Sequence, residues 1–383
     1  MNDLNLGLQP LCNRFLEKDS SDEFVHNMHL VQDRNTGLVG IKTPALAEEM
    51  QTKYKWLSET EPTNHFKSVA KTIEKLSGLN GKSRILSFSY RDKPLSNELL
   101  KSGFENIVNT QRNIPEFVGV AKIQKQLCDN SFIENIINKY GAFDLLLINR
   151  IIHHVHDLEI FFSSINNLLD DKGYAVIEVP DCARGFFDLD YNIIFEEHVY
   201  YFTSSTLKHL IELNGFEIVS FEIFSYPFEN ALVAIIKKSD VNKISILLDH
   251  VAKEIKLFTK FSQSFPLVKQ AIKSFFLDIS TKGSIIFFGA GHHGISFVNI
   301  MEISQYVDCF IDDVEEKQNY YTPGSYLPIF GSDYLTKNNI ALCVVSVSQE
   351  NEEQVIKKIR LISNNKFNIY SIFPASKHAL PIY

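Results

Sequence analysis

The sequence predicts an α/β protein in which two parallel sheets, each covered by helices on both faces, are joined by a helical connector. Short apolar runs alternate with amphipathic segments over residues 61–238, and the alternation starts again after residue 280. Continuous apolar strands separated by helices are typical of parallel sheets buried on both sides. A length of 383 residues also exceeds that of one ordinary domain.

The first lobe is predicted from the order of these segments. Phe66, Val69 and Ile73 recur at helical spacing, Gly103 is placed to end a helix, and a short loop near residue 227 predicts an antiparallel hairpin at one edge. The predicted helices cover 62–76, 94–102, 122–140, 158–169 and 204–214, and the predicted strands cover 84–89, 106–109, 143–148, 174–179, 216–224 and 231–237.

The rest of the chain divides around this lobe. Residues before 60 show little periodicity apart from a short predicted helix over 45–50, after Pro44. One or two helices are predicted over 241–280. Strands at 284–288, 307–312, 341–346 and 368–373, with helices at 295–301 and 350–362, predict a second Rossmann-like lobe. The expected parts are a small N-terminal lobe (1–60), the first α/β lobe (61–238), the connector (239–280) and the second α/β lobe (281–383).

Composition excludes several classes of function. The net charge is −8 and Lys and Arg do not cluster, which argues against nucleic-acid binding and favours a small-molecule substrate. The five cysteines form no CxxC pair, so neither a disulfide framework nor a closed zinc site is predicted, and a reducing cytoplasmic location is expected. The sequence shows neither a signal-peptide pattern nor a long apolar run, so neither a signal peptide nor a membrane span is expected. Oligomeric state is not predicted.

The densest group of polar side chains is Phe195-Glu-Glu-His-Val-Tyr-Tyr-Phe202, shortly after a predicted buried strand. An imidazole beside a carboxylate can act as a general base near neutral pH, which makes His198 the candidate base and Glu197 its orienting acid. Tyr200 and Tyr201 are candidates for hydrogen bonds to a substrate oxygen. The alternative is a structural loop with its aromatic rings in the core.

A glycine-rich turn in the second lobe is the other candidate site. A strand runs into Gly289-Ala-Gly-His-His-Gly294 and then a helix, a pattern that can hold an anion on backbone N–H groups. Asp312 ends the next strand, where an acid can bind a ribose or sugar hydroxyl. The predicted substrate residues of this lobe are Gly289, Gly291, His292, His293, Gly294 and Asp312. The alternative is that the turn only packs strand against helix.

The first lobe differs at the corresponding turn. Residues 87–94 contain no glycine, so side chains limit the approach of a ligand to the backbone, and Gln111 follows the second strand where an acid is usual. His153, His154 and His156 match no metal-ligand spacing, and no metal is predicted. Residues expected to line a cofactor pocket are Ser89, Asp92, Gln111 and Asn149.

Taken with the segment from Asn149 to Asp157, the strand ending Glu178-Val-Pro180 and the Glu197-His198-Val-Tyr-Tyr-Phe202 run, the chain resembles the sugar C-methyltransferases. Leu6-Gly-Leu-Gln-Pro-Leu-Cys-Asn-Arg-Phe-Leu16 and Phe288-Gly-Ala-Gly-His-His-Gly294 extend the resemblance over nearly the whole length.

The resemblance implies a class I methyltransferase-like Rossmann domain that binds S-adenosylmethionine. It implies a nucleotide-linked 4-keto-deoxysugar as the substrate, lying between the two α/β lobes, and His198 as the base at C3. The family's zinc-binding cysteine pair is replaced over Val31–Gly37, so no zinc is expected, and its catalytic tyrosine is Phe195 here.

Two hypotheses follow. Either the chain methylates a keto-sugar with an altered donor pocket, or it has lost the donor and acts as a donor-independent isomerase or epimerase or as a non-catalytic partner. Titration with S-adenosylmethionine distinguishes them.

Overall fold

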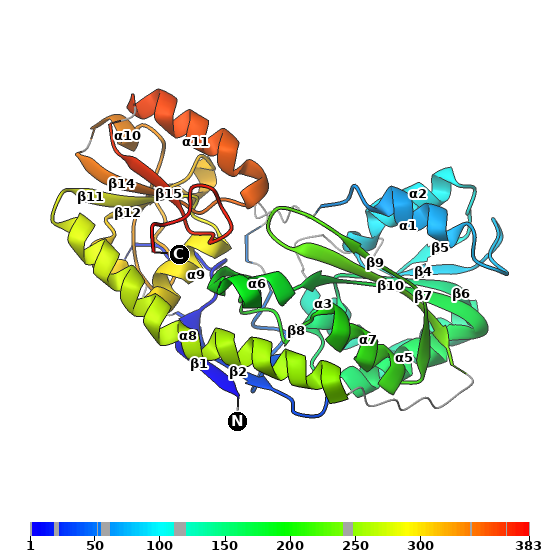
Figure 1. Cartoon of the computed structure of the whole chain (residues 1–383). Helices are drawn as coiled ribbons and strands as arrows, with labels where there is room; N and C mark the ends of the chain where they lie inside the picture. Colours follow the sequence, from blue (N-terminus) through cyan, green and yellow to red (C-terminus); the bar gives the residue numbers. More distant parts are fainter. Residues whose placement is uncertain are drawn as a thin grey trace.

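The computed structural model describes residues 2–18, 23–51, 53–54, 62–110, 120–239, 248–337, 339–364 and 366–382. Within these residues the strands form sheets of four, six and five strands (Figure 1). The predicted α/β class is confirmed, with one sheet in each α/β lobe and a smaller antiparallel sheet between them. No helix in the described part of the chain is long and apolar enough to cross a membrane.

The small sheet combines the N-terminal residues with a segment from the middle of the chain. Its order is β1 (Asp3–Pro10), β2 (Val25–Gln32), β3 (Val39–Ile41) and β8 (Tyr200–Tyr201), with each pair antiparallel. The helix predicted over 45–50 is wrong, because residues 47–50 form turns. In place of a cysteine pair, the turn after β2 is closed by Asp33, whose Oδ1 accepts from the amides of Asn35 and Thr36 at 3.0 and 2.7 Å.

The central sheet carries the predicted parallel strands and the hairpin. Its order is β5 (Ile107–Asn109), β4 (Ile85–Ser87), β6 (Phe143–Asn149), β7 (Leu169–Asp181), β10 (Asn230–Lys238) and β9 (Phe216–Phe224). The first four strands are parallel and the last two are antiparallel additions, as the short loop near residue 227 predicts.

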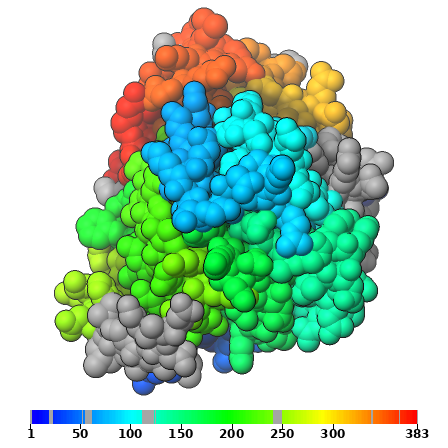
Figure 2. Space-filling model, turned by 90° about the vertical axis from the view of Figure 1, so that its right-hand side faces the viewer, coloured from blue at the N-terminus to red at the C-terminus, as the bar shows by residue number. Residues whose placement is uncertain are grey.

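Helices cover both faces of this sheet. One face packs against α1 (Phe66–Ile73) and α2 (Lys93–Lys101), which lie on the surface in blue and cyan in Figure 2. The other packs against α3 (Val120–Leu127), α4 (Asn130–Tyr140), α5 (Leu158–Leu168) and α7 (Ser204–Leu213). The single helix predicted over 122–140 is wrong, because Asp129 leaves helical geometry and caps α4 by accepting from Ser131 and Phe132.

The C-terminal sheet is parallel throughout. Its order is β13 (Ile329–Phe330), β12 (Cys309–Ile311), β11 (Ser284–Phe288), β14 (Ile340–Val345) and β15 (Asn368–Ser371). The helices beside it are α9 (His292–Met301), α10 (Tyr334–Lys337) and α11 (Gln349–Ser363). Because α9 begins at His292, both histidines of the glycine-rich stretch lie in its first turn, ahead of the start predicted at residue 295.

One long helix, α8 (Leu248–Ser280), runs beneath both α/β lobes and contains Pro266 (Figure 1). Its 33 residues give a length of about 50 Å at 1.5 Å per residue. Phe258, Phe261 and Phe276 of this helix lie in a core that also holds Leu4 of the N-terminal sheet and Leu380 near the C-terminus. A shorter helix, α6 (Ala183–Asp188), packs on α8 from the central lobe.

Candidate functional site

The loop after β4 is organised around the buried Asp92 carboxylate. Its Oδ2 accepts from the backbone amides of Phe88 and Ser89, both at 2.8 Å. Its Oδ1 accepts from the backbone amide and the side-chain amide of Asn149, both at 2.9 Å. Burial raises the pKa of Asp92 to about 7, against these hydrogen bonds. The loop therefore directs its amides at its own carboxylate, and Ser89 Oγ caps the short helical turn (Tyr90–Asp92) by accepting from Arg91.

Asn149 ends β6 at the carboxyl edge of the central sheet, where ligands gather in open α/β folds. Its side-chain amide donates to Asp92, but its Oδ1 is buried without a hydrogen-bond partner. A buried acceptor without a donor is costly, so this atom marks a place where a ligand donor would be stabilising.

Beside Asn149 lies a buried network of charged side chains. Arg150 Nε is 3.0 Å from Glu178 Oε1, and its Nη1 is 3.0 Å from Glu229 Oε1. Glu178 Oε2 is 3.4 Å from His65 Nε2, an ion-pair contact whose geometry does not make a hydrogen bond, and His65 Nδ1 lies 2.8 Å from Tyr226 Oη. Burial acts to raise the pKa of Glu178, but His65 and Arg150 together hold it below its usual value.

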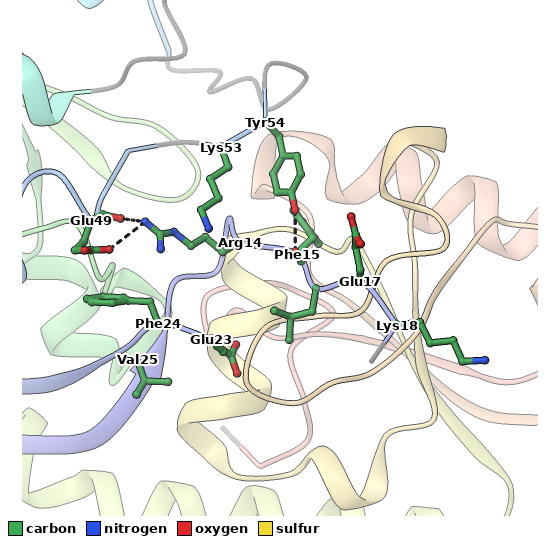
Figure 3. A pocket seen from close by; sticks show the side chains of 11 residues that line it. Arg14, Phe15, Glu17, Lys18, Glu23, Phe24, Val25, Glu49, Lys53 and Tyr54 are labelled. Carbon is green, nitrogen blue, oxygen red and sulfur yellow. Dashed lines mark hydrogen bonds and ion pairs between the residues drawn. The ribbon is translucent and has the colours of Figure 1, made fainter. Parts of the chain in front are cut away.

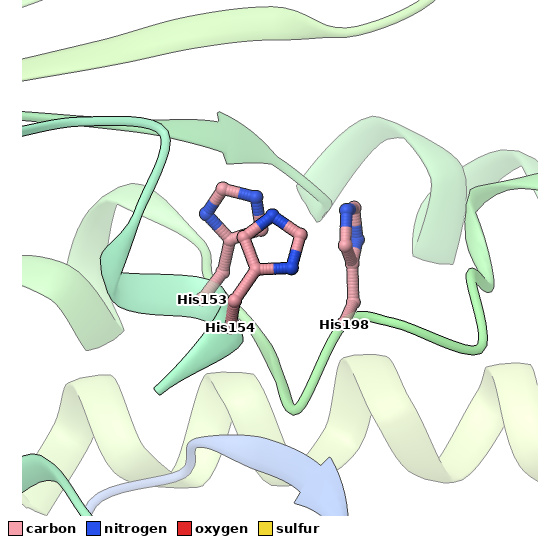
Figure 4. A group of neighbouring side chains, drawn as sticks. All are labelled: His153, His154 and His198. Carbon is pink, nitrogen blue, oxygen red and sulfur yellow. The ribbon is translucent and has the colours of Figure 1, made fainter. Parts of the chain in front are cut away.

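His153, His154 and His198 form a buried cluster at the same edge (Figure 4). The His153 ring centroid lies 4.0 Å from that of His154 and 4.6 Å from that of His198. His154 Nδ1 is 2.9 Å from the Glu197 carbonyl oxygen, and its Nε2 is 3.3 Å from Arg91 Nη1. Burial and neighbouring positive groups lower the pKa of His153 and His198 well below the ordinary value, so both rings are neutral at neutral pH.

Phe195 connects this cluster with the C-terminal lobe. Its ring stacks on His198 at 4.8 Å between centroids and on His292 at 3.8 Å. Glu196, which the sequence analysis did not select, reaches across the same boundary, and its Oε2 lies 3.0 Å from His292 Nδ1. Its Oε1 accepts from the Cys12 amide at 2.5 Å. Burial alone would lower the pKa of His292, but the Glu196 carboxylate beside it raises this pKa above its usual value.

The two tyrosines of the stretch form β8 against β3. Tyr201 is buried and its hydroxyl donates to the Phe195 carbonyl at 3.0 Å. The Tyr200 hydroxyl lies 3.5 Å from the His156 carbonyl, and its ring covers Gly40. Both phenols thus have backbone partners, and their role toward a substrate stays a prediction.

The glycine turn packs strand, helix and neighbouring loop closely. A side chain at Gly289, where φ is +110°, would collide with Val347, and one at Gly294 with Ser346. Gly291 has open space around it and caps α9. Asp312 holds the turn, because its Oδ2 accepts from the Ala290 amide at 2.8 Å and contacts Lys317 Nζ at 2.9 Å.

The structure thus separates the predicted site residues into two groups. Asp92, Ser89, Asn149, Glu197 and His198 come from the carboxyl edge of the central sheet. The residues of the glycine turn come from the C-terminal lobe, and of these His292 reaches Phe195 and Glu196. His293 is enclosed by Phe195, Phe228 and Phe373, and burial lowers its pKa to about 3. Gln111 lies outside the described residues.

Several residues of this region were missed from the sequence, among them Cys12, Arg91, Arg150 and Glu196. Arg91 Nη1 donates to the Arg150 carbonyl at 3.0 Å and faces His154, so it belongs to the histidine cluster. The absence of glycine from its loop was the available signal, since a long side chain then occupies the space beside the strand end. No spacing rule relates Cys12 to Glu196.

A pocket of about 750 Å³ lies elsewhere, beside the N-terminal sheet (Figure 3). Arg14 and Glu49 form an ion pair at 3.5 Å on its wall, and the Tyr54 hydroxyl donates to the Phe15 carbonyl at 2.8 Å. Of the predicted site residues that the structure describes, none lines it.

His153 provides a test of the burial of this cluster. The unfolded chain takes up a proton at His153 as pH falls through about 6.5, whereas the folded chain does not, so stability is lost below that pH. The free energy of unfolding of the wild-type protein falls between about pH 7.5 and about pH 5.5. His153→Phe is expected to make this fall smaller by about 1.4 kcal/mol, measured by urea unfolding at the two pH values. The exposed His250→Asn is the control. An unchanged acid sensitivity in His153→Phe would contradict this account of the cluster.

Comparison with protein families identifies the two α/β lobes. Residues 63–221 match the model of a methyltransferase domain. Residues 247–372 match the model of a C-methyltransferase C-terminal domain. The chain is thus similar to a methyltransferase domain over one region and to a C-methyltransferase C-terminal domain over another. These matches confirm the prediction of a methyltransferase-like protein, and they do not identify its substrate.

Among the solved structures similar to this chain is 1,6-didemethyltoxoflavin-N1-methyltransferase from Burkholderia thailandensis. The two are 15% identical, the match covers 46% of this chain and 78% of that chain, and the TM-score is 0.31. Magnesium protoporphyrin IX methyltransferase from Synechocystis PCC 6803 has 14% identity, covers 48% of this chain and 91% of its own, and has a TM-score of 0.33. No curated protein matches the chain. Likeness at this level bears on neither its substrate nor its cofactor.

Proposed function

We propose that this protein acts at the carbon beside a carbonyl group of a nucleotide-linked keto-deoxysugar, with His198 as the base, and that it is a C-methyltransferase. The observation that carries the proposal is the position of His198. Its neutral ring is buried at the carboxyl edge of the central sheet, and Phe195 joins it by stacking to the C-terminal lobe. A substrate between the two α/β lobes would meet this ring.

The proton transfer uses the neutral form of His198. Its lowered pKa keeps the accepting nitrogen unprotonated at neutral pH, and a carbonyl group makes the proton on the adjacent carbon acidic. The positive charge that forms on the ring is disfavoured by Arg91 and Arg150 in the free protein. The negative charges of a nucleotide diphosphate would offset them, so the base gains strength when the substrate is bound.

Glu197 acts in this proposal through its neighbour. Its carbonyl oxygen accepts from His154 Nδ1, which fixes the ring against which His198 packs at 5.0 Å between centroids. Glu197 therefore positions the His198 base through its backbone carbonyl, which holds the His154 ring in place.

S-adenosylmethionine would supply the methyl group. The residues present fit this donor at Asn149, whose orphaned buried Oδ1 can accept from the ammonium group of its methionine part. They fit less well at the loop after β4, where Phe88 and Ser89 already donate their amides to Asp92. We therefore expect the donor to be held mainly by the methionine end.

Calorimetric titration with S-adenosylmethionine and S-adenosylhomocysteine tests the proposal. Saturable heat is expected with both, while adenosine, which lacks the amino-acid part, is expected to bind at least about tenfold more weakly, equivalent to about 1.4 kcal/mol. No heat with either ligand at millimolar concentration would rule out methyl transfer.

The second candidate is donor-independent proton transfer at the same carbon, such as epimerisation. The hydrogen bonds that close the β4 loop on Asp92 favour it, because they occupy the amides a donor would otherwise use. Solvent deuterium uptake into a keto-sugar in the absence of S-adenosylmethionine, together with formation of the inverted product, would select it.

A further inference from the structure

Cys12, Glu196 and His292 bring three metal-ligand types together from segments far apart in the chain. Cys12 follows β1, Glu196 precedes β8, and His292 is the first residue of α9. One potential ligand atom from each, a thiol sulfur, a carboxylate oxygen and a ring nitrogen, lies within 4.8 Å of the others. Sulfur, nitrogen and oxygen of these residues are the ligands of protein-bound zinc.

The orientation of His292 directs its second ring nitrogen at the Glu196 carboxylate. Its Nε2 lies 3.3 Å from the Ile194 carbonyl oxygen, so this nitrogen carries a hydrogen and donates it. The Phe195 ring stacked at 3.8 Å fixes the plane of the imidazole. Nδ1 then faces Glu196 Oε2 at 3.0 Å, and two lone pairs at that distance require a proton or a metal ion between them.

The surrounding contacts match those of a metal-binding histidine. Such a histidine usually donates its other ring N–H to a carbonyl or carboxylate, which is the role of the Ile194 carbonyl here. The Cys12 amide donates to the second oxygen of Glu196 and so orients the carboxylate. Tetrahedral zinc holds two such ligands about 3.3 Å apart, so a movement of a few tenths of an ångström accommodates it.

A second group of metal-ligand types in the described residues is less suited to a metal ion. It consists of His153, His154 and His198. Both nitrogens of His154 have polar neighbours, and one of these is the guanidinium of Arg91. A metal ion there would meet a fixed positive charge. The first group contains a carboxylate and a thiol; burial and Glu196 raise the pKa of the Cys12 thiol in the metal-free protein, and a bound metal ion would deprotonate it.

We propose that Cys12 Sγ, Glu196 and His292 Nδ1 bind one zinc ion, with a fourth position open to water. The ion joins the N-terminal sheet, the central lobe and the C-terminal lobe at one point. This differs from the absence of metal predicted from the sequence, where no spacing relates the three residues.

Metal content of the full-length protein tests the site without any substrate. After removal of metals with a chelator and incubation with zinc followed by desalting, about one zinc per chain is expected. Cys12→Ser and His292→Gln are each expected to weaken zinc binding at least about a hundredfold in competition with a chromogenic chelator. His154→Asn and Cys343→Ser, in the other cluster and in the core of the C-terminal lobe, are the matched controls and are expected to keep it.

Cobalt(II) provides an independent readout. The wild-type protein and Cys343→Ser are expected to show a thiolate-to-cobalt charge-transfer band that Cys12→Ser lacks. Circular dichroism establishes whether each variant is folded. If Cys12→Ser does not fold, the zinc affinity of His292→Gln tests the proposal. A wild-type protein that retains no zinc and shows no cobalt band would overturn the proposal, as would folded Cys12→Ser and His292→Gln variants with unchanged affinity. A failed methylation or exchange assay bears only on the proposed function.

Discussion

His198→Asn is expected to lower the rate of proton exchange at the carbon beside the carbonyl by about 10²- to 10⁴-fold, the usual contribution of a general base. The neutral ring of His198 is the proposed acceptor, and asparagine keeps a polar side chain there without a basic nitrogen. The measurement is solvent deuterium uptake into a keto-sugar nucleotide, followed by NMR. Because exchange needs no methyl donor, it applies to both candidate functions.

The control for this experiment is His156→Asn, a histidine of the same region whose side chain is exposed. It is expected to exchange at the wild-type rate. If folded His198→Asn also exchanged at that rate, the assignment of His198 as the base would be wrong, and a group elsewhere in the two lobes would have to be sought.

Glu178→Ala is expected to cost about 3–5 kcal/mol of unfolding free energy, because it removes the more deeply buried of the two carboxylates that pair with the Arg150 guanidinium. The Glu178 side chain is 1% exposed and that of Arg150 5%, so water cannot replace the lost carboxylate. Urea unfolding monitored by circular dichroism measures the change.

Glu229 gives the matched control, since it contacts the same guanidinium at 3.0 Å but its side chain is 17% exposed. Glu229→Ala is expected to cost distinctly less. The double replacement Glu178→Met with Arg150→Met is expected to recover much of the loss, because both charges are removed together. Equal losses for Glu178→Ala and Glu229→Ala would contradict the role given to burial.

The α/β lobes could be predicted because their strands are apolar on both faces. Strands β4, β6, β11 and β14 are short runs of Leu, Ile, Val and Phe between amphipathic helices, and such runs have few other stable arrangements. The N-terminal sheet was not predicted, although β1 alternates Leu4, Leu6 and Leu8 with Asn5, Gly7 and Gln9, a period of two that is typical of a strand. The break at Asp129 also had a signal, since aspartate is one of the residues preferred at the position just before a helix.

The candidate site was predictable only in part. His198 lies beside the histidines that follow β6, but α6 and a helical turn (Tyr191–Ile193) separate it from the end of β7, so its place could not be derived from the strand before it. That His292 belongs to a helix turn facing Glu196 depends on how two lobes pack, which local patterns do not encode. The same holds for the closed loop around Asp92, because the partner of its carboxylate, Asn149, comes from another strand.

The shared core has a consequence for how the chain is made. Leu16 pairs with Tyr321, and Leu4 lies in one core with Leu380, so the strands of the N-terminal sheet find partners that are synthesised more than 300 residues later. At the pace of translation this delay is on the order of tens of seconds. During that time β1 and β2 leave the ribosome with their apolar face uncovered, which makes this nascent chain a natural client of chaperones that shield such surfaces.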